Sequence, residues 1–271
     1  MRVLVVTAVP AERDAVVRGV RAAAAESADT PEAAEVSVPG GRTLHRVVRP
    51  TLTLDALAAG VGPAAAAAAT ATALTAAELG TAGRPTGLAA AGPGAAGPGA
   101  AGLDAAPYGL VVSAGIGGGF TPAPLGTVVV AEAIVAADLG AETPDGFAAV
   151  TDLGFGTVEH LPPPALVRAV AEAAGAARGA VLTVSTVTGS AGRATELLRR
   201  HPRAAAEAME GFGVAEAAAA HGVPVLEVRA ISNTVGPRDR AAWRIGEALD
   251  ALAGAFRDLP PALAIWKGPS T

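Results

Sequence analysis

Three polar side chains stand at the start or end of predicted secondary-structure elements. Glu12 lies in the first turn of a helix that Pro10 opens, Glu210 begins a later helix, and Asn233 ends an apolar strand. A carboxylate can accept a proton from water or stabilise positive charge, and an amide can both donate and accept hydrogen bonds. Each residue alone also has a structural explanation, because carboxylates favour helix N-termini and asparagine starts turns. Together, at the ends of elements in one α/β sheet, they predict a crevice for a small polar molecule.

A glycine-rich run over residues 115–119 follows an apolar strand. A dinucleotide fingerprint would need a helix that begins at these glycines. The prolines at 122 and 124 prevent such a helix, so a dehydrogenase is disfavoured. The run is then either a tight turn or bare backbone on which a sugar or base can lie, and the sequence leaves both interpretations open.

The composition excludes several classes of partner. The formal net charge is -5 and the pI is near 5.4, so the chain lacks the basic surface that a nucleic-acid partner requires. It has no cysteine, and its 4 histidines are far apart in the sequence, so we expect no metal site. The N-terminal apolar run is too short for a signal peptide, and residues 60–77 are too weakly apolar to span a membrane. We therefore expect a cytoplasmic protein without a membrane or nucleic-acid partner.

Apolar strands alternate with helices along most of the chain. This alternation predicts a three-layer α/β architecture, and the length fits a single domain over residues 1–271. A repeated Pro-Gly-Ala-Ala-Gly pattern at 83–107 predicts a flexible surface loop, and residues 259–271 a dispensable Pro-rich tail. The predicted strands cover residues 2–7, 51–59, 109–113, 125–136, 179–187 and 224–232. One predicted helix begins at residue 10, and the others cover residues 63–79, 164–176, 189–200, 209–221 and 240–257.

Two segments near the C-terminus carry a resemblance to a known family. Residues 208–211 read Ala-Met-Glu-Gly, and after a helix residues 225–233 read Val-Leu-Glu-Val-Arg-Ala-Ile-Ser-Asn. At this spacing they resemble the Met-Glu helix and the Val-Arg-Ala-Ile-Ser-Asp strand of methylthioadenosine/S-adenosylhomocysteine nucleosidases and purine nucleoside phosphorylases. The resemblance implies a nucleoside phosphorylase-like αβα fold with a central mixed β-sheet, a small-molecule nucleoside substrate and a homo-oligomer.

Carried over residue by residue, the resemblance implies roles for the polar residues. Glu12 would activate the attacking water, Glu210 would hold the ribose hydroxyls, and Met209 would pack against the sugar. Gly115 and Ser232 lie in matching segments and are expected to contact the substrate. Such roles suit the cleavage of an N-ribosidic bond, in which the sugar develops positive charge. We expect no cofactor, because protonation of the base and charge stabilisation at the sugar can lower the barrier.

Asn233 is an informative departure from the adenine-releasing nucleosidases. Those enzymes carry an aspartate here, which donates a proton to N7 of the leaving base. An amide cannot donate a full proton, but it can meet N7-H and O6 of a 6-oxopurine together. The same substitution is found in 6-oxopurine phosphorylases and in futalosine hydrolases. A second departure is Ala208, where the family often has an acidic residue.

Further stretches resemble futalosine hydrolases, at residues 137–147 and 233–243. The resemblance implies hydrolysis of futalosine to hypoxanthine and dehypoxanthine futalosine, in menaquinone biosynthesis. We hypothesise that Arg238 or Arg240 pairs with the carboxylate of the substrate and that Trp243 packs on its aryl ring. Alternatively, the arginines lie in a solvated turn and Trp243 belongs to the core.

Three other functions remain as alternatives. In a purine nucleoside phosphorylase, phosphate would replace water, and its candidate ligands are Arg13, Arg42, Arg46 and Arg49. The Gly-rich phosphate turn of phosphorylases is missing, however, because residues 8–11 read Ala-Val-Pro-Ala at that bend. A methylthioadenosine/S-adenosylhomocysteine nucleosidase and a non-catalytic nucleoside-binding domain on the same fold are the others.

Overall fold

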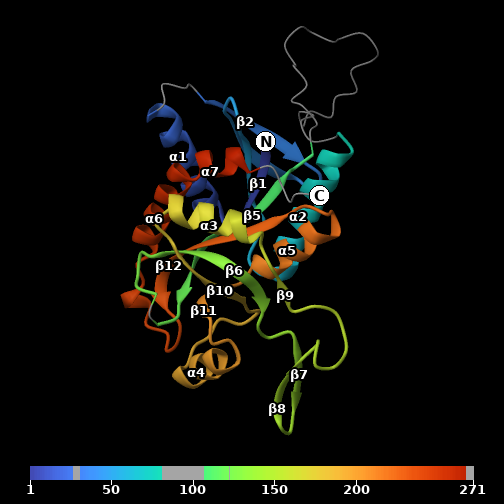
Figure 1. The fold of residues 1–271 in the computed structure, drawn as a ribbon, viewed down its shortest axis with the longest axis vertical. Coiled ribbons are helices and arrows are strands. Elements are labelled where there is room, and N and C mark those ends of the chain that lie inside the picture. The colour runs from blue at the N-terminus through green and yellow to red at the C-terminus, as the bar shows by residue number, and fades with distance from the viewer. Residues whose placement is uncertain (27–30, 81–106, 122, 267–271) are drawn as a thin grey trace.

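The computed structural model describes residues 1–26, 31–80, 107–121 and 123–266 (Figure 1). The predicted loop at 83–107, apart from Pro107, and residues 267–271 of the predicted tail lie outside these ranges. The strands of the main sheet are β1 (Arg2–Thr7), β2 (Glu32–Val38), β3 (Arg42–Val48), β4 (Thr53–Ala58), β5 (Leu110–Gly119), β6 (Val128–Ala136), β9 (Glu159–His160), β10 (Ala177–Thr183), β11 (Ala204–Ala208) and β12 (Val225–Thr234).

These strands form one mixed sheet in the order β11-β10-β6-β12-β5-β1-β4-β3-β2, with β9 added beside β6. Strand β11 also pairs with β5, so β5, β12, β6, β10 and β11 close into a ring of strands. A separate hairpin is formed by β7 (Gly140–Thr143) and β8 (Gly146–Ala149). It projects from the end of the molecule opposite the N-terminus (Figure 1).

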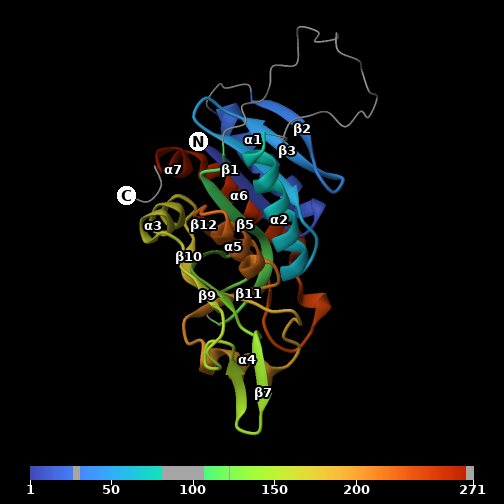
Figure 2. The same cartoon turned by 90° about the vertical axis from the view of Figure 1, so that its right-hand side faces the viewer.

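Helices cover both faces of the sheet, as the two views in Figures 1 and 2 show. One face is covered by α1 (Pro10–Glu26) and α6 (Ile245–Asp258), and the other by α2 (Pro63–Glu78) and α5 (Gly211–Ala220). The remaining helices are α3 (Pro164–Ala173), α4 (Ala191–Arg200), α7 (Pro260–Ile265) and the 3-10 turn η1 (Arg240–Ala242). This arrangement confirms the predicted αβα fold with a central mixed sheet.

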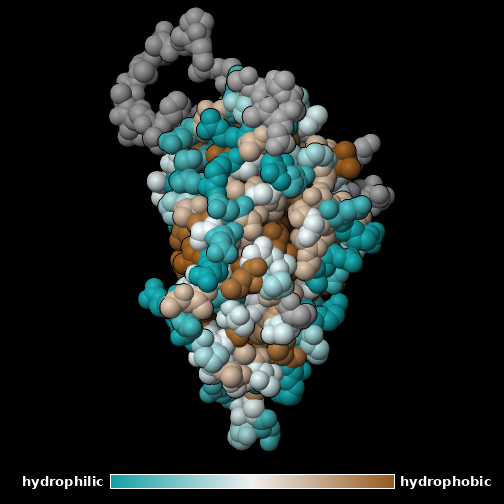
Figure 3. All heavy atoms as spheres, turned by 90° about the vertical axis from the view of Figure 1, so that its left-hand side faces the viewer, coloured by the Kyte–Doolittle hydropathy of each residue, from teal (hydrophilic) through white to brown (hydrophobic). Residues whose placement is uncertain are grey.

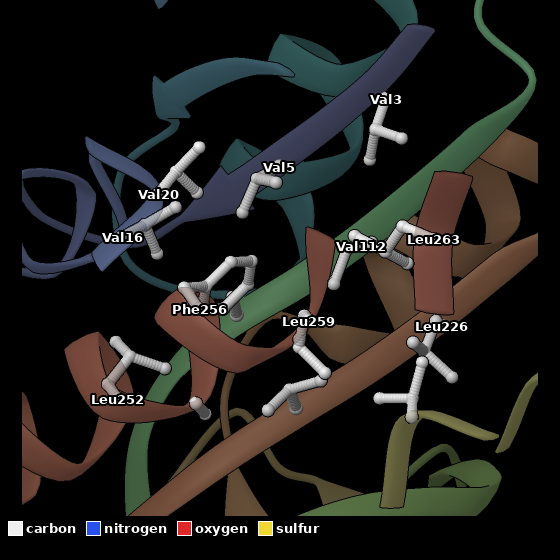
Figure 4. Close-up of a cluster of buried hydrophobic side chains, with 14 of the residues drawn as sticks. Val3, Val5, Val16, Val20, Val112, Leu226, Leu252, Phe256, Leu259 and Leu263 are labelled. Atoms are coloured by element: carbon white, nitrogen blue, oxygen red, sulfur yellow. The ribbon is translucent and has the colours of Figure 1, made fainter. Parts of the chain in front are cut away.

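Strand β1 is buried along its whole length. Because successive side chains of a strand point to opposite faces, Val3 and Val5 pack with Phe256 in one core, whereas Leu4 and Val6 belong to the other. Figure 4 shows the first of these cores, in which Val5 of β1 lies near Val20 of α1 and Phe256 of α6. A strand buried on both faces has no polar alternation, and this explains the continuous apolar run.

The parallel strands determine where a site can form. Strands β4, β1, β5 and β12 are neighbours and run parallel, so their carboxyl ends meet at one edge of the sheet. Glu12 and the turn before α2 follow the ends of β1 and β4, and Asn233 lies in β12, next to its end. Open α/β sheets bind ligands at this edge.

The structure corrects several predicted boundaries. The glycine run is not a tight turn, because β5 continues through it to Gly119. The helix predicted from residue 209 begins at Gly211, so Met209 and Glu210 lie between β11 and α5. The helix predicted from 240 is divided, since α6 starts at Ile245 and only η1 precedes it.

The prediction of a dispensable tail from residue 259 is wrong for its first part. Residues 260–265 form α7, and Leu259 and Leu263 are buried in the same core as β1. The prolines at 260 and 261 did not exclude a helix, because proline is tolerated in a first helical turn.

The surface is mixed in character. On the face shown in Figure 3, hydrophilic atoms are spread widely, and hydrophobic ones gather in patches at mid-height and below. Among the residues that the structure describes, no helix is both long and apolar enough to cross a lipid bilayer.

Candidate active site

A cavity of about 370 Å³ lies at the carboxyl edge of the parallel strands. It is formed by the turn after β1, the glycine end of β5, the junction between β11 and α5, and the end of β12 with the segment that follows it. Seven of the residues predicted from the sequence to form a site line it: Glu12, Met209, Glu210, Ser232, Asn233, Arg238 and Trp243.

Glu12 is held rigidly although it lines the cavity. Its side chain is 4 % exposed, and its carboxylate accepts hydrogen bonds from Ala8 N–H at 2.9 Å, Val9 N–H at 3.2 Å and Ile116 N–H at 2.9 Å. Burial raises the pKa of Glu12, although Arg229 and the N–H groups of Ile116 and Val9 lower it in part. A buried carboxylate with a raised pKa is a better proton acceptor than one in water, as a general base needs to be.

Gly115 lies directly behind Glu12. A Cβ at this position would be 2.6 Å from Glu12 Oε1 and 2.8 Å from Arg229 Nη1. Only a residue without a side chain allows these two charged groups to approach the β5 backbone so closely. Gly115 is therefore required by the packing of the site, and the cavity itself is lined by the next residues, Ile116 to Gly118.

Glu210 forms hydrogen bonds to residues from both halves of the chain. Its Oε1 accepts a hydrogen bond from Gly62 N–H at 3.1 Å, in the turn before α2, and its Oε2 accepts one from Arg229 Nη1 at 3.2 Å. Glu210 is 4 % exposed and lines the cavity next to Met209. The short gap between β11 and α5 brings both residues to the cavity wall.

Arg229 is the centre of a buried network that sequence reasoning did not assign. Its guanidinium is fully buried and donates to Glu227 Oε1 at 2.9 Å, to Glu210 Oε2 at 3.2 Å and to Ser113 Oγ at 2.9 Å. Burial lowers the pKa of Arg229, but Glu227, Glu210 and Glu12 raise it above its ordinary value. This arginine orients Glu210 and lies close enough to Glu12 to affect its pKa.

The sequence did contain a signal for this network. Glu227 and Arg229 are two residues apart in an otherwise apolar strand, so both side chains point to the same face. Charged groups in a buried strand must be paired, because an isolated buried charge is too costly.

A β-bulge positions Asn233. The register of β12 against β5 shifts between Ile231 and Asn233, so Ser232 is the extra residue. The Ser232 hydroxyl lies 3.2 Å from Gly117 O and 2.9 Å from Asn233 Oδ1, and Asn233 Nδ2 donates to Thr234 O at 3.1 Å. The amide is thereby fixed at the cavity with one N–H still available as a donor.

The segment after β12 forms the far wall of the cavity. Trp243 is half-buried, and the guanidinium carbons of Arg238 and Arg240 lie 5.5 Å and 5.8 Å from the centre of its ring. These distances are in the range of cation–π contacts. Arg238 and Trp243 line the cavity, whereas Arg240 contacts it only through the tryptophan. Trp243 is thus a wall residue, and not a core residue as the alternative interpretation required.

Glu207 is a second residue that the sequence interpretation missed. Its carboxylate lines the cavity, is 6 % exposed and accepts hydrogen bonds from Thr188 N–H at 2.8 Å and Thr188 Oγ1 at 2.5 Å. Burial raises the pKa of Glu207, and the bonds from Thr188 lower it in part. The family often has an acidic residue at the position of Ala208. In this chain Glu207, one residue earlier, brings a carboxylate to the cavity instead.

The arginines considered as phosphate ligands do not form a cluster at the cavity. None of Arg13, Arg42, Arg46 and Arg49 lines it. Arg13 pairs with Asp14 on the surface, and Arg46 is buried against Asp55 in the outer part of the sheet. Arg42 and Arg46 lie in β3, and Arg49 follows this strand directly. The sequence did not predict the β2–β3–β4 meander, and this is why the separation of these arginines from the site was not foreseen.

Comparisons with known proteins agree with this geometry. The family model of the Phosphorylase superfamily matches residues 2–259. A futalosine hydrolase of Streptomyces coelicolor is 61% identical over 268 residues, which are 98% of each chain. Among solved structures, the futalosine hydrolase of Helicobacter pylori strain 26695 has a TM-score of 0.69 at 16% identity and 97% coverage of both chains.

A methylthioadenosine/S-adenosylhomocysteine nucleosidase of Neisseria meningitidis, in complex with methylthio-immucillin-A, has a TM-score of 0.70 at 16% identity. It covers 98% of this chain and 99% of its own. At this identity the likeness to the two solved structures concerns the fold. The chain belongs to the phosphorylase superfamily. Within that superfamily it is a member of the futalosine hydrolase family, as its full-length relative at 61% identity shows.

Proposed function

We propose that the chain hydrolyses the N-ribosidic bond of futalosine and releases hypoxanthine and dehypoxanthine futalosine, a step of menaquinone biosynthesis. The observation that carries the proposal is that Glu12, Glu210 and Asn233, which are far apart in the sequence, line one cavity. Membership of the futalosine hydrolase family supports the choice of substrate. The proposal includes a cytoplasmic location, as expected from the sequence, and a homo-oligomer, as the family resemblance implies.

Glu12 acts in this proposal as the base that activates water. Its carboxylate takes a proton from the water while the oxygen attacks C1′ of the ribose. The bond between C1′ and N9 breaks, its electron pair leaves with the base, and the base takes up a proton from solvent. The ribose passes through an oxocarbenium-like state, whose positive charge is stabilised by the neighbouring carboxylates.

Glu210 holds the ribose in position. Its carboxylate is fixed on one side by Gly62 N–H and on the other by Arg229, so it presents its remaining acceptor positions to the sugar hydroxyls. Met209 packs against the sugar beside it. A fixed sugar lowers the entropic cost of bringing C1′ and the water together.

Asn233 recognises the leaving base. Its free N–H donates to O6 of hypoxanthine, where negative charge develops as the bond breaks, and its Oδ1 accepts from N7-H. The bulge at Ser232 fixes the amide before the substrate arrives, so no reorganisation is needed at the moment of reaction.

Arg238 and Trp243 provide a place for the other end of the substrate. The aryl carboxylate of futalosine would pair with Arg238, and its ring would pack against Trp243. Both residues are on the cavity wall that the segment after β12 forms. Inosine lacks this aryl carboxylate and would lose those contacts.

The test offers futalosine, inosine and methylthioadenosine separately, each with and without inorganic phosphate, and measures free base by chromatography. We expect hypoxanthine from futalosine at a rate that phosphate does not change, a much slower release from inosine, and no adenine from methylthioadenosine. A strict requirement for phosphate with formation of a ribose 1-phosphate, or adenine release as fast as hypoxanthine release, would overturn the proposal.

A further inference from the structure

Glu207 has no part in the mechanism described above, although it lines the same cavity. It is buried, and among the residues that the structure describes no arginine, lysine or histidine forms an ion pair with it. By contrast, Glu210 and Glu227 both pair with Arg229. An ionised carboxylate offers about four acceptor positions, and Thr188 fills two of those on Glu207. Its remaining acceptor positions can therefore serve a ligand.

The strand register places Glu207 in line with Asn233. Glu207 of β11 is opposite Gly118 of β5, and Gly118 is opposite Asn233 of β12. Residues in register on neighbouring strands point to the same face of a sheet, so both side chains lie on one face with the glycine between them. Two strand spacings correspond to roughly 10 Å between their Cα atoms. A purine and the two side chains that hold its edges can fill this gap.

Gly118 leaves the space between the two side chains open. A Cβ at this position would lie 3.2 Å from Asn233 Nδ2 and 2.8 Å from Val235 Cγ2. The backbone between Glu207 and Asn233 is thus bare on the face that both side chains occupy. Bare backbone of this kind allows a flat ring to lie close to it.

Resting on the proposed function, we propose that Glu207 accepts a hydrogen bond from N1-H of the 6-oxopurine and thereby selects it over a 6-aminopurine. N1 of hypoxanthine carries a proton and lies beside O6, which Asn233 meets. N1 of adenine carries a lone pair instead, which would face the carboxylate without a proton between them. A charge-assisted hydrogen bond to one base and lone-pair repulsion from the other give discrimination at one atom.

The test measures the affinities of free hypoxanthine and free adenine by calorimetry for wild-type protein, Glu207→Gln and Thr188→Val. For Glu207→Gln we expect the ratio of the two affinities to fall on the order of 10–100-fold, because a hydrogen bond to a charged group is lost and the amide can donate to adenine N1. For Thr188→Val we expect both affinities to change by the same factor, because the carboxylate remains. Glu207→Asp, which withdraws the charge by one methylene group, provides a second variant and should change the ratio in the same direction.

A ratio that stays at the wild-type value in both Glu207 variants would overturn the assignment. So would an equal change of the ratio in Thr188→Val, because Glu207 would then act only through its contact with the Thr188 hydroxyl. Thermal melts monitored by circular dichroism check that each variant is folded. Base binding needs no turnover, so the outcomes separate the two proposals: wild-type protein that prefers hypoxanthine but leaves futalosine intact would refute the reaction and leave the role of Glu207 standing.

Discussion

Two buried clusters of charge lie on the same sheet, and they differ in their balance. In the first, the Asp55 carboxylate of β4 accepts hydrogen bonds from Arg2, Arg46 and Tyr108. There two guanidinium groups share one carboxylate. In the second, beside the cavity, the single guanidinium of Arg229 serves several carboxylates, two of them by direct hydrogen bonds.

This difference shifts the pKa values of the carboxylates in opposite directions. Burial alone would raise the pKa of Asp55, but the hydrogen bonds and charge of Arg46 hold it below its usual value. Burial raises the pKa of Glu12, and Arg229 offsets this only in part. A cluster with surplus cation is a structural clamp, whereas a cluster with surplus carboxylate keeps a negative potential at the cavity wall. A positively charged sugar would be stabilised by the second and not by the first.

The largest expected effect comes from Glu12→Gln, which should lower kcat/KM for futalosine by about 10²- to 10⁴-fold, because the base is lost. The free energy of unfolding should change by no more than about 1–2 kcal/mol, since the amide oxygen keeps part of the bonding and no charge is buried. Steady-state kinetics and urea unfolding measure the two quantities. A variant that loses stability and activity in parallel would show that Glu12 is as structural as Asp55.

Asp55→Asn is expected to have the opposite profile. It leaves two buried guanidinium groups without a carboxylate and should lower the free energy of unfolding by about 3–5 kcal/mol, whereas kcat/KM of the protein that remains folded should be unchanged. Asp250→Asn is the matched control, because Asp250 pairs with Arg18 on the surface and is 81% exposed. The control should cost no more than about 1 kcal/mol, as measured by urea unfolding. A loss of activity in folded Asp55→Asn protein would break the comparison.

The smallest expected effect is a difference between the pH at which activity is lost and the pH at which stability is lost. Glu12 must be ionised to act, so kcat/KM should fall as pH falls through its raised pKa, above the usual range of a glutamate. The stability that Asp55 contributes has the sign of a lowered pKa: it is full above the pKa of an unfolded aspartate, about 3.9, and is lost as pH falls further. Activity should therefore disappear before the melting temperature drops. Profiles of kcat/KM and of Tm that fall together would contradict this order.

The sequence predicted most of the site because the site residues stand where elements begin or end. Glu12 follows one strand with an unmistakable apolar run and Asn233 lies at the end of another, and Met209 and Glu210 lie in a recognisable motif. The strands β2 and β3 were missed, because β2 begins with four exposed residues and lacks an apolar run. Tertiary contacts decide such elements, and local sequence does not.

The glycine run shows a different limit. Glycine is a poor strand former, so five consecutive residues with four glycines predict a break. Strand β5 nevertheless continues through them, because Glu12, Arg229 and Asn233 approach the backbone too closely for side chains. A requirement imposed by groups 100 or more residues away cannot be read from the local sequence, since Glu12 reaches Ile116 across 104 residues.

The hydrogen bonds that fix the two carboxylates span long stretches of chain: 104 residues from Glu12 to Ile116, and 148 from Gly62 to Glu210. Neither the first half of the polypeptide nor the second contains a complete site. During refolding, closure of such long loops comes late, so catalytic competence should return after the helices have formed. For the same reason, if the two halves were produced as separate fragments, neither alone should show turnover, and activity should return only when the two associate.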